Sequence, residues 1–160
     1  MANPKDDPPG SRYLQDFIPG EVIHTPRLRV TEAELIAFAE RYDPQYYHTD
    51  PRAASQSIFG GLVAGGFQTA ALSWALALRT GLFDRCAMAG VSLEGLRWFE
   101  PLRPDDTVRC EITVLSNRPS RSKPDRGVIE ARYDLFNQHD IKILTLTLTQ
   151  MLARRPATSP

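Results

Sequence analysis

The sequence is poor in cysteine and has no excess of charge of either sign. Its two cysteines, Cys86 and Cys110, lack metal-ligand spacing and are too few for a disulfide framework, so we expect two reduced thiols in or near the core. Lys and Arg together count 19, as do Asp and Glu, which gives a formal net charge of zero. Nucleic-acid-binding proteins normally show a basic excess or a basic stripe. The composition therefore argues against a nucleic-acid partner.

Long hydrophobic runs are also missing. No stretch approaches the ~18 consecutive apolar residues of a membrane-spanning helix, and residues 1–20 are polar and contain prolines, unlike a secretory signal. We therefore expect a cytoplasmic protein without a membrane partner. A chain of 160 residues is long enough for one domain with a hydrophobic core. We expect a flexible leader over residues 1–20, the domain over 21–153 and a tail over 154–160.

Two helices are predicted in the first half of the chain, and between them we expect a non-helical bend followed by a short helical turn over residues 51–57, which opens with a proline. Thr31 is a favourable N-cap, and Glu34 completes a capping box. Apolar residues follow at helical spacing, and Pro44 ends the helix because the residue before a proline avoids the α region. Residues 67–82 form a second helix that is apolar on nearly every side, so we expect it to be buried.

Strand patterns dominate the rest of the chain. They cover residues 21–30, where Pro26 indicates an edge or irregular strand, and then residues 89–98, 107–117, 127–137 and 141–153. One hydrophobic helix followed by an antiparallel meander predicts an α+β fold with the sheet wrapped around the helix. One curved sheet cannot cover every side of so apolar a helix. We therefore expect a second subunit.

The residues best suited to catalysis lie in two neighbouring segments, 42–50 (YDPQYYHTD) and 59–67 (FGGLVAGGF). Asp43 and His48 are five positions apart, just upstream of the glycine-rich start of the long helix. Alone, Asp43 before a proline suits a turn, and His48 suits a satisfied buried histidine. Together they provide an acid–base pair beside the free N–H groups of a helix start. We therefore favour a catalytic interpretation.

The same two segments resemble the MaoC-like dehydratases, which include the R-specific enoyl-CoA hydratases. The likeness extends in element order over about residues 21–153 and is most specific over 42–71. It implies a hotdog fold, in which an antiparallel sheet wraps around a long central helix, and a homodimer with sites at the subunit interface. It also implies reversible hydration of a 2-enoyl-CoA, with no metal and no cofactor other than the coenzyme A carried by the substrate.

The resemblance also assigns catalytic roles to three positions. In that family an aspartate and a histidine five residues later hold the water that adds across the double bond; these match Asp43 and His48. A backbone N–H at the start of the central helix polarises the thioester carbonyl, and that position matches Gly66.

The chain departs from the family in three places. Residues 45–46 are Gln-Tyr where Asn-Pro is usual, and residues 65–66 are Gly-Gly where His-Gly is usual. The serine that supports the family's site from deeper in the helix falls by counting near Trp74, with Ser73 beside it.

Six further residues are predicted to bind substrate, because they flank the pair or the helix start or carry a guanidinium suited to phosphate. They are Tyr46, Tyr47, Phe59, Gly65, Phe67 and Arg103. Simpler roles stay open for several side chains. Phe67 and Trp74 suit the core, and Asp50 before a proline suits a helix cap. The side chains that suit either coenzyme A phosphates or solvent are Arg97, Arg103, Arg118 and Arg121.

Hydrating an enoyl thioester requires a base for the attacking water, an acid for C2, and donors for the developing oxyanion. Asp43 and His48 supply the first two as a pair, without a separate assignment of base and acid. The helix start at Gly66 supplies the third. Two rival functions remain. One is a hotdog thioesterase, in which a carboxylate directs water at the carbonyl carbon, and the other is a non-catalytic subunit that binds acyl thioesters.

Overall fold

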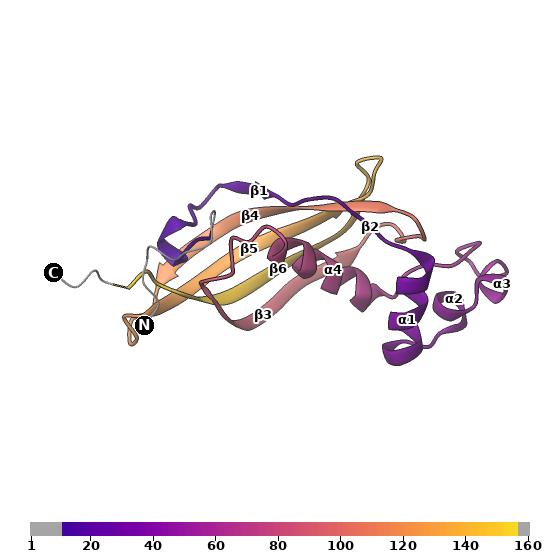
Figure 1. Cartoon of the computed structure of the whole chain (residues 1–160), viewed down its shortest axis with the longest axis horizontal. Coiled ribbons are helices and arrows are strands. Elements are labelled where there is room, and N and C mark those ends of the chain that lie inside the picture. Colours follow the sequence, from indigo (N-terminus) through magenta and orange to yellow (C-terminus); the bar gives the residue numbers. More distant parts are fainter. Residues whose placement is uncertain (1–10, 157–160) are drawn as a thin grey trace.

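One antiparallel sheet wraps around one long helix in the computed structural model, which describes residues 11–156 (Figure 1). The sheet order is β1-β4-β5-β6-β3, and β2 also pairs with β4. The strands are β1 (Val22–His24), β2 (Leu28–Arg29), β3 (Ala87–Trp98), β4 (Thr107–Pro119), β5 (Arg126–Phe136) and β6 (Lys142–Ala153). The four long strands are those predicted, and the first predicted strand is split in two around its proline. The predicted α+β fold is confirmed.

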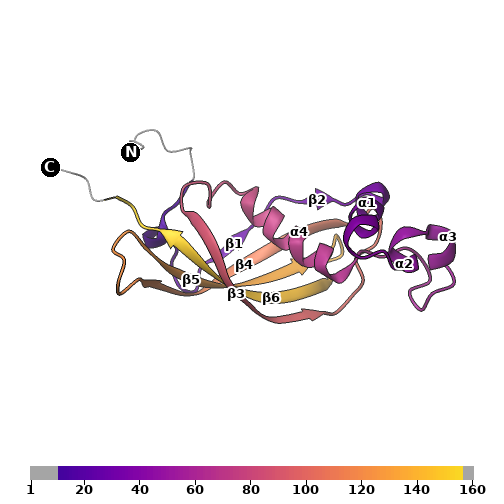
Figure 2. The ribbon, with the colours of Figure 1, turned by 90° about the horizontal axis from the view of Figure 1, so that it is seen from below.

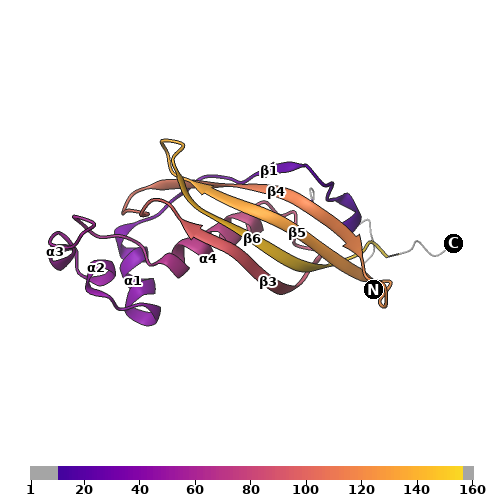
Figure 3. The ribbon, with the colours of Figure 1, turned by 180° about the vertical axis from the view of Figure 1, so that it is seen from behind.

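The long helix α4 (Gly66–Leu78) lies along one face of the sheet, as Figure 2 shows from below and Figure 3 from behind. Its sheet-facing residues, which include Ser73 and Leu76, are buried. We predicted that this helix would be buried on nearly every side. In the single chain that is not so, because Phe67 is 72% exposed. The helix also ends four residues earlier than predicted, ahead of Gly81, which adopts a positive φ of 72°. Within one chain, α4 is covered on one side only.

Helix α1 (Glu32–Tyr42) has the predicted capping box. The Thr31 hydroxyl accepts a hydrogen bond from the Glu34 N–H at 3.3 Å, and the Glu34 carboxylate accepts from the Thr31 N–H at 2.8 Å. The Thr31 N–H and the Thr31 hydroxyl, which donates to the same carboxylate at 2.7 Å, lower the pKa of Glu34 below its ordinary value. Asp43 is the C-cap with a non-helical φ of −155°, so it lies just beyond the helix, as predicted.

Two short helices follow, and one of them was not predicted. Residues 46–49 were expected to form a non-helical bend, but they form one helical turn, α2 (Tyr46–Thr49). The Gln45 carbonyl starts this turn by accepting from the His48 N–H at 2.9 Å. Helix α3 (Pro51–Ala54) is capped by Asp50, whose carboxylate accepts from two backbone N–H groups, and this is the role expected of it.

The N-terminal segment corrects the predicted domain boundary. Residues 11–20 were assigned to a flexible leader, but Leu14 and Phe17 are each 1% exposed. The Asn117 amide donates to the carbonyls of both at 2.5 and 2.7 Å, and Phe17 stacks on Phe83 at 5.2 Å. These side chains close one end of the core, so the domain begins before residue 21. Residues 1–10 lie outside the described part of the chain.

The C-terminal end of the described chain is also held in place. The Arg155 guanidinium lies 2.6 Å from the Asp16 carboxylate, and the Arg154 N–H donates to the Asp125 carbonyl at 2.8 Å. The first residues of the predicted tail 154–160 are therefore attached to the domain, and residues 157–160 lie outside the described part.

The core fills the space between the sheet, α4 and the N-terminal segment. Both cysteines lie in it as free thiols, and burial raises the pKa of Cys86 to about 12 and raises that of Cys110 as well. Strand β3 lies outside this pattern. It is the last strand in the sheet order, and almost all of its residues are exposed. The large apolar side chains that it exposes are Met88, Val91, Leu93 and Trp98.

Candidate active site

The candidate site lies where α4 begins, near the end of α1 and the single turn of α2. Figures 1 and 2 show α1, α2 and α3 gathered at this end of the molecule. Asp43 ends α1, and His48 lies in the single turn of α2. The Asp43 Oδ2 lies 3.6 Å from the His48 Nε2, and their side chains are 24% and 7% exposed. This separation exceeds that of a direct hydrogen bond. A small group could contact both atoms by bridging them from one side.

The His48 ring is oriented by the backbone. Its Nδ1 lies 2.7 Å from the Val63 carbonyl oxygen. A carbonyl oxygen can only accept a hydrogen bond, so Nδ1 carries a hydrogen. In the neutral ring, Nε2 is therefore the acceptor, and it faces Asp43. The imidazole thus presents a basic atom to the carboxylate side of the site.

Asp43 is oriented by the side chain of Gln45 and has room because residue 65 is a glycine. Its Oδ1 accepts a hydrogen bond from the Gln45 Nε2 at 2.7 Å, which leaves Oδ2 toward His48. A Cβ added at Gly65 would lie 3.0 Å from the same Oδ2. The glycine at 65, one of the departures from the family pattern, therefore leaves the space in which this carboxylate lies.

The start of α4 is exposed to the same region. Gly66 is the first helical residue, and its N-cap, Gly65, forms no side-chain capping bond. The first N–H groups of a helix lack intrahelical partners, so this end offers free donors and a positive dipole end. The Trp98 indole donates to the Gly66 carbonyl at 3.0 Å, and its ring would lie 2.9 Å from a Cβ at this position. Glycine is thus needed here for the indole to pack.

A cavity of about 320 Å³ connects the imidazole with the helix start. It is mainly aromatic and apolar, with the imidazole of His48, the hydroxyl of Thr69 and the carboxylate of Glu100 as polar groups. Its lining residues are Tyr47, His48, Phe59, Val63, Ala64, Gly66, Thr69, Trp98, Phe99, Glu100, Pro101 and Leu102. The cavity can hold a small, largely apolar molecule against the imidazole of His48 and the start of α4, and Asp43 lies beside the imidazole, outside the lining.

The structure brings some of the six predicted substrate-binding residues to this cavity and not others. Tyr47 and Phe59 line it, with ring centroids 5.3 Å apart. Gly65 lies against the Asp43 carboxylate. Tyr46 is 53% exposed and packs on Tyr47 outside the lining. Phe67 lines a different cavity, described below.

The predicted phosphate-binding arginines do not gather at the cavity. The Arg103 guanidinium donates to the Phe59 carbonyl at 2.9 Å, so it holds the loop that carries Phe59. Arg118 and Arg121 line a hollow at the turn between β4 and β5, at the opposite end of the sheet from α1–α3 (Figure 1). Arg97 lies on the exposed strand β3. Arg103 is thus the one member of this group with a contact to the site.

Sequence reasoning missed three groups at the site. Trp98 reaches the helix start from β3, and Thr69 donates its hydroxyl to the Gly65 carbonyl at 3.0 Å. The third is the Val63 carbonyl, which orients the imidazole. No motif identifies Trp98, because it lies 32 positions after Gly66 and only the sheet brings it back. Thr69 had a signal, since it lies in the first turn of the predicted helix.

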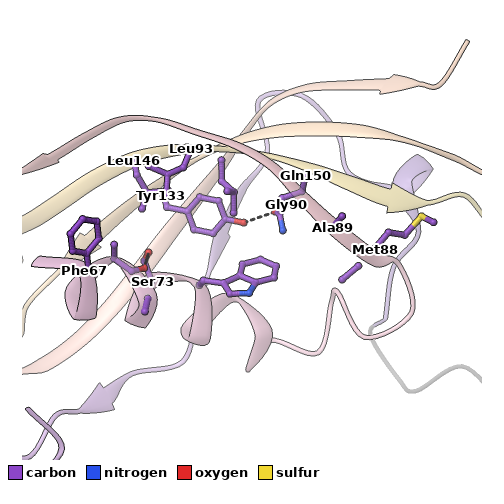
Figure 4. Close-up of a pocket in the computed structure, with 14 residues that line it drawn as sticks. Phe67, Ser73, Met88, Ala89, Gly90, Leu93, Tyr133, Leu146 and Gln150 are labelled. Atoms are coloured by element: carbon purple, nitrogen blue, oxygen red, sulfur yellow. Dashed lines mark hydrogen bonds between the residues drawn. The ribbon is translucent and has the colours of Figure 1, made fainter. Parts of the chain in front are cut away.

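A second, larger cavity lies between α4 and strands β3, β5 and β6 (Figure 4). Its volume is about 510 Å³, and most of its lining is apolar. Its polar groups include Ser73 and the Tyr133 hydroxyl, which donates to the Gln150 side-chain oxygen at 3.0 Å. Phe67 lies at one end and contacts Trp98 of the first cavity edge to face at 6.3 Å. Trp74, expected in the core, lines this second cavity and is only half-buried.

Residues 11–156 contain no helix that is both long and apolar enough to cross a membrane. Within the same residues, no three His, Cys, Asp or Glu side chains are grouped as metal ligands.

Comparisons with known proteins agree on one family. The MaoC like domain model matches residues 15–133. Uncharacterized protein YdeM of Bacillus subtilis (strain 168) is 30% identical over 141 residues, which cover 88% of this chain and 99% of YdeM. Protein MaoC of Klebsiella aerogenes is 34% identical over 106 residues, 66% of this chain but 31% of that longer protein.

Solved structures give the same result. The crystal structure of the MaoC-like dehydratase from Rhodospirillum rubrum has a TM-score of 0.82 at 36% identity, over 91% of this chain and 99% of that one. R-hydratase PhaJ1 from Pseudomonas aeruginosa shares the fold, with a TM-score of 0.71 at 21% identity over 92% and 93%. So does a double-hotdog protein from Mycobacterium tuberculosis, with 0.69 at 18% over 94% and 47%. The chain therefore belongs to the MaoC-like dehydratase family and has the hotdog fold.

Proposed function

We propose that this protein catalyses the reversible hydration of a 2-enoyl-CoA, which is equally the dehydration of a 3-hydroxyacyl-CoA. The observation that carries the proposal is the separation of 3.6 Å between Oδ2 of Asp43 and Nε2 of His48, beside the start of α4. Both atoms accept hydrogen bonds when the carboxylate is ionised and the ring is neutral. A water molecule that bridges them from one side would donate one hydrogen to each. The MaoC-like dehydratase from Rhodospirillum rubrum, at 36% identity, supports the same class of reaction.

In the forward direction the oxygen of this water attacks C3 of the enoyl group. One O–H bond of the water breaks, and its proton passes to the Asp43–His48 pair as the new C–O bond forms. The pair then returns a proton to C2, so the sum of the steps adds one water across the double bond. Because both groups would contact the same water, the acid and base roles are assigned to the pair and not to either residue alone.

The negative charge that develops on the thioester oxygen needs a donor. The Gly66 N–H at the start of α4 supplies it, strengthened by the helix dipole. A lost donor of this kind typically costs about 10²–10³ in rate. The aromatic lining of the 320 Å³ cavity would enclose the enoyl group and exclude bulk water. No cofactor beyond the coenzyme A of the substrate enters the reaction, because the thioester already acidifies C2.

The proposed active form is a homodimer that pairs through β3. An edge strand with exposed apolar side chains invites pairing with a second copy. Strand β3 exposes apolar side chains along its 12 residues, although its register with β6 shifts at three points. The same contact would cover the open side of α4, where Phe67 is exposed. Trp98 ends β3 and lines the cavity, so the interface would lie next to the site.

The direct test is to mix the protein with crotonyl-CoA and follow the ultraviolet absorbance of the conjugated enoyl thioester. We expect the absorbance to fall with the parent protein and to persist with Asp43→Asn. A parallel measurement with DTNB detects released thiol, which a thioesterase would produce and a hydratase would not. The proposal is wrong if short, branched and aromatic enoyl-CoAs all bind without loss of absorbance; that result favours a binding subunit.

A further inference from the structure

A hydrogen-bonded chain leads from Tyr47 to the carboxylate of Asp43. The Gln45 Nε2 donates to the Asp43 Oδ1 at 2.7 Å, and the Tyr47 hydroxyl donates to the Gln45 Oε1. The chemistry fixes the direction of both bonds. A carboxylate only accepts, so the amide nitrogen must face Asp43; the amide oxygen then faces Tyr47 and requires a donor there.

Tyr47 also contacts the other member of the pair. Its ring packs edge to face on the His48 ring, with centroids 4.5 Å apart and planes at 73°. Its carbonyl accepts from the Val63 N–H at 3.2 Å, while the Val63 carbonyl binds the His48 Nδ1. Phe59 packs on the Tyr47 ring, with centroids 5.3 Å apart. Tyr47 is therefore fixed on several sides and touches the imidazole directly.

We propose that Tyr47 is a positioning residue for both members of the Asp43–His48 pair. Its ring supports the imidazole, and its hydroxyl orders the Gln45 amide, which orients the Asp43 carboxylate. This inference rests on the proposed hydratase function, and it explains how residues 45–47 of this chain work without the Asn-Pro that is usual in the family.

The proposal follows from what each group can do alone. Gln45 is exposed, so water competes for its amide and a single bond to Asp43 would not hold it in one rotamer. Tyr47 is half-buried and its ring is packed, so its hydroxyl is a fixed anchor for that amide. With Oδ1 of Asp43 and Nδ1 of His48 both occupied, Oδ2 and Nε2 are left facing each other. Small displacements of such groups are costly, since about 1 Å can reduce a rate about 10²-fold.

Tyr47 also lines the cavity, so a simple substrate contact is the competing explanation. Single and double variants separate the two. We expect Tyr47→Phe and Gln45→Ala each to lower kcat on crotonyl-CoA by about tenfold or more, with KM changed less than about twofold. Because the hydroxyl acts through the amide, Tyr47→Phe should have no further effect in the Gln45→Ala background. Gln45→Glu, which keeps the shape but loses the donor, should be as slow as Gln45→Ala.

The matched control is Tyr42→Phe, which makes the same change one residue before Asp43. Tyr42 is 63% exposed and packs on Phe38 of its own helix. We expect its kcat to equal that of the parent. Additive losses in the double variant, or a Tyr47→Phe effect confined to KM, would overturn the proposal in favour of a substrate contact.

A second readout does not depend on activity. In ¹³C-labelled protein, the Asp43 Cγ resonance reports the hydrogen bonds of its carboxylate. We expect Tyr47→Phe to move this resonance in the parent but not in the Gln45→Ala background, and Tyr42→Phe to leave it in place. If the parent hydrates no enoyl-CoA, the proposed function fails, and this measurement alone decides the positioning role. An Asp43 resonance that is unchanged in Tyr47→Phe refutes it.

Discussion

Oδ2 of Asp43 and Nε2 of His48 lie 3.6 Å apart, although Asp43 lies just beyond α1 and His48 lies in α2. Asp43 caps the end of α1, and His48 lies in the following single turn of α2. Pro44 stops the first helix, and the Gln45 carbonyl starts the second. The break between them allows the chain to turn the imidazole back toward the carboxylate.

Removing either member of the pair should abolish most of the activity. We expect Asp43→Asn and His48→Gln each to lower kcat by about 10²–10⁴-fold, the usual contribution of general acid–base groups. Thermal unfolding should change little for Asp43→Asn, because that side chain is partly exposed. Asp84→Asn, the same change at an exposed turn, serves as the control for activity. Two folded variants with parental rates would end the assignment of the pair.

Gly65→Ala should displace the Asp43 carboxylate without unfolding the protein. The added Cβ would lie 3.0 Å from Oδ2, so the side chain must shift. Gly65 has φ −63° and ψ 145°, which alanine adopts freely. The melting temperature of the Gly65→Ala protein should therefore not fall. We expect kcat to drop by about 10²-fold. Gly61→Ala, whose Cβ meets Arg103 only at 3.7 Å, is the matched control and should retain parental kcat.

Arg103→Gln distinguishes loop support from phosphate binding. The guanidinium holds the Phe59 carbonyl at 2.9 Å, so its loss should loosen the Phe59 loop and lower kcat/KM for any thioester. We expect equal losses with crotonyl-CoA and with the crotonyl thioester of N-acetylcysteamine, which has no phosphates. Arg29→Gln, at an exposed ion pair with Asp105, is the control. A loss seen only with the coenzyme A substrate would restore the phosphate-binding prediction.

A charge on the exposed edge strand should separate the proposed dimer. Val91 lies within β3 and is 56% exposed in the single chain, so Val91→Arg would place a guanidinium in the proposed interface. We expect light scattering to show a dimer for the parent and a monomer for the variant, with reduced activity. Val22→Arg places the same charge on exposed β1 as a control. A parent that is monomeric and active would contradict the proposed assembly.

Alkaline pH should destabilise the fold through the buried thiols. Burial raises the pKa of Cys86 to about 12, whereas an unfolded cysteine titrates near ~8.5. Between these values the folded chain retains a proton that the unfolded chain releases, so the free energy of unfolding falls as pH rises. Urea unfolding at about pH 7.5 and about pH 10, on either side of the ~8.5 of an unfolded cysteine, checks this. Cys86→Ala should show a smaller fall, and an equal fall would refute this source.

Local sequence signals predicted the elements whose causes are local. The Thr31 capping box, the stop at Pro44 and the strand alternation act between near neighbours, so the boundaries of α1 and of the four long strands follow closely. The pairing of Asp43 with His48 was also predictable, because five positions across a proline break limit how far the two side chains can separate.

Other features depended on partners far along the chain. Residues 11–20 were misassigned because only the folded sheet provides Asn117 and Phe83 as contacts for Leu14 and Phe17. The turn of α2 was missed for a different, local reason. It is stabilised by bonds to the nearby Gln45 carbonyl, but its aromatic residues are weak helix formers. Propensity therefore did not predict it.

Short-range chemistry in the chain was thus sufficient for the helix caps, the strands and the proximity of Asp43 and His48. Folding in three dimensions decided which atoms of the pair face each other, because the Val63 carbonyl and the Gln45 amide occupy the others. It also decided that Trp98 closes on Gly66 and that Arg103 supports Phe59. The Trp98–Gly66 and Arg103–Phe59 contacts join residues 32 and 44 positions apart. No periodicity or spacing in a sequence encodes a distance across a sheet.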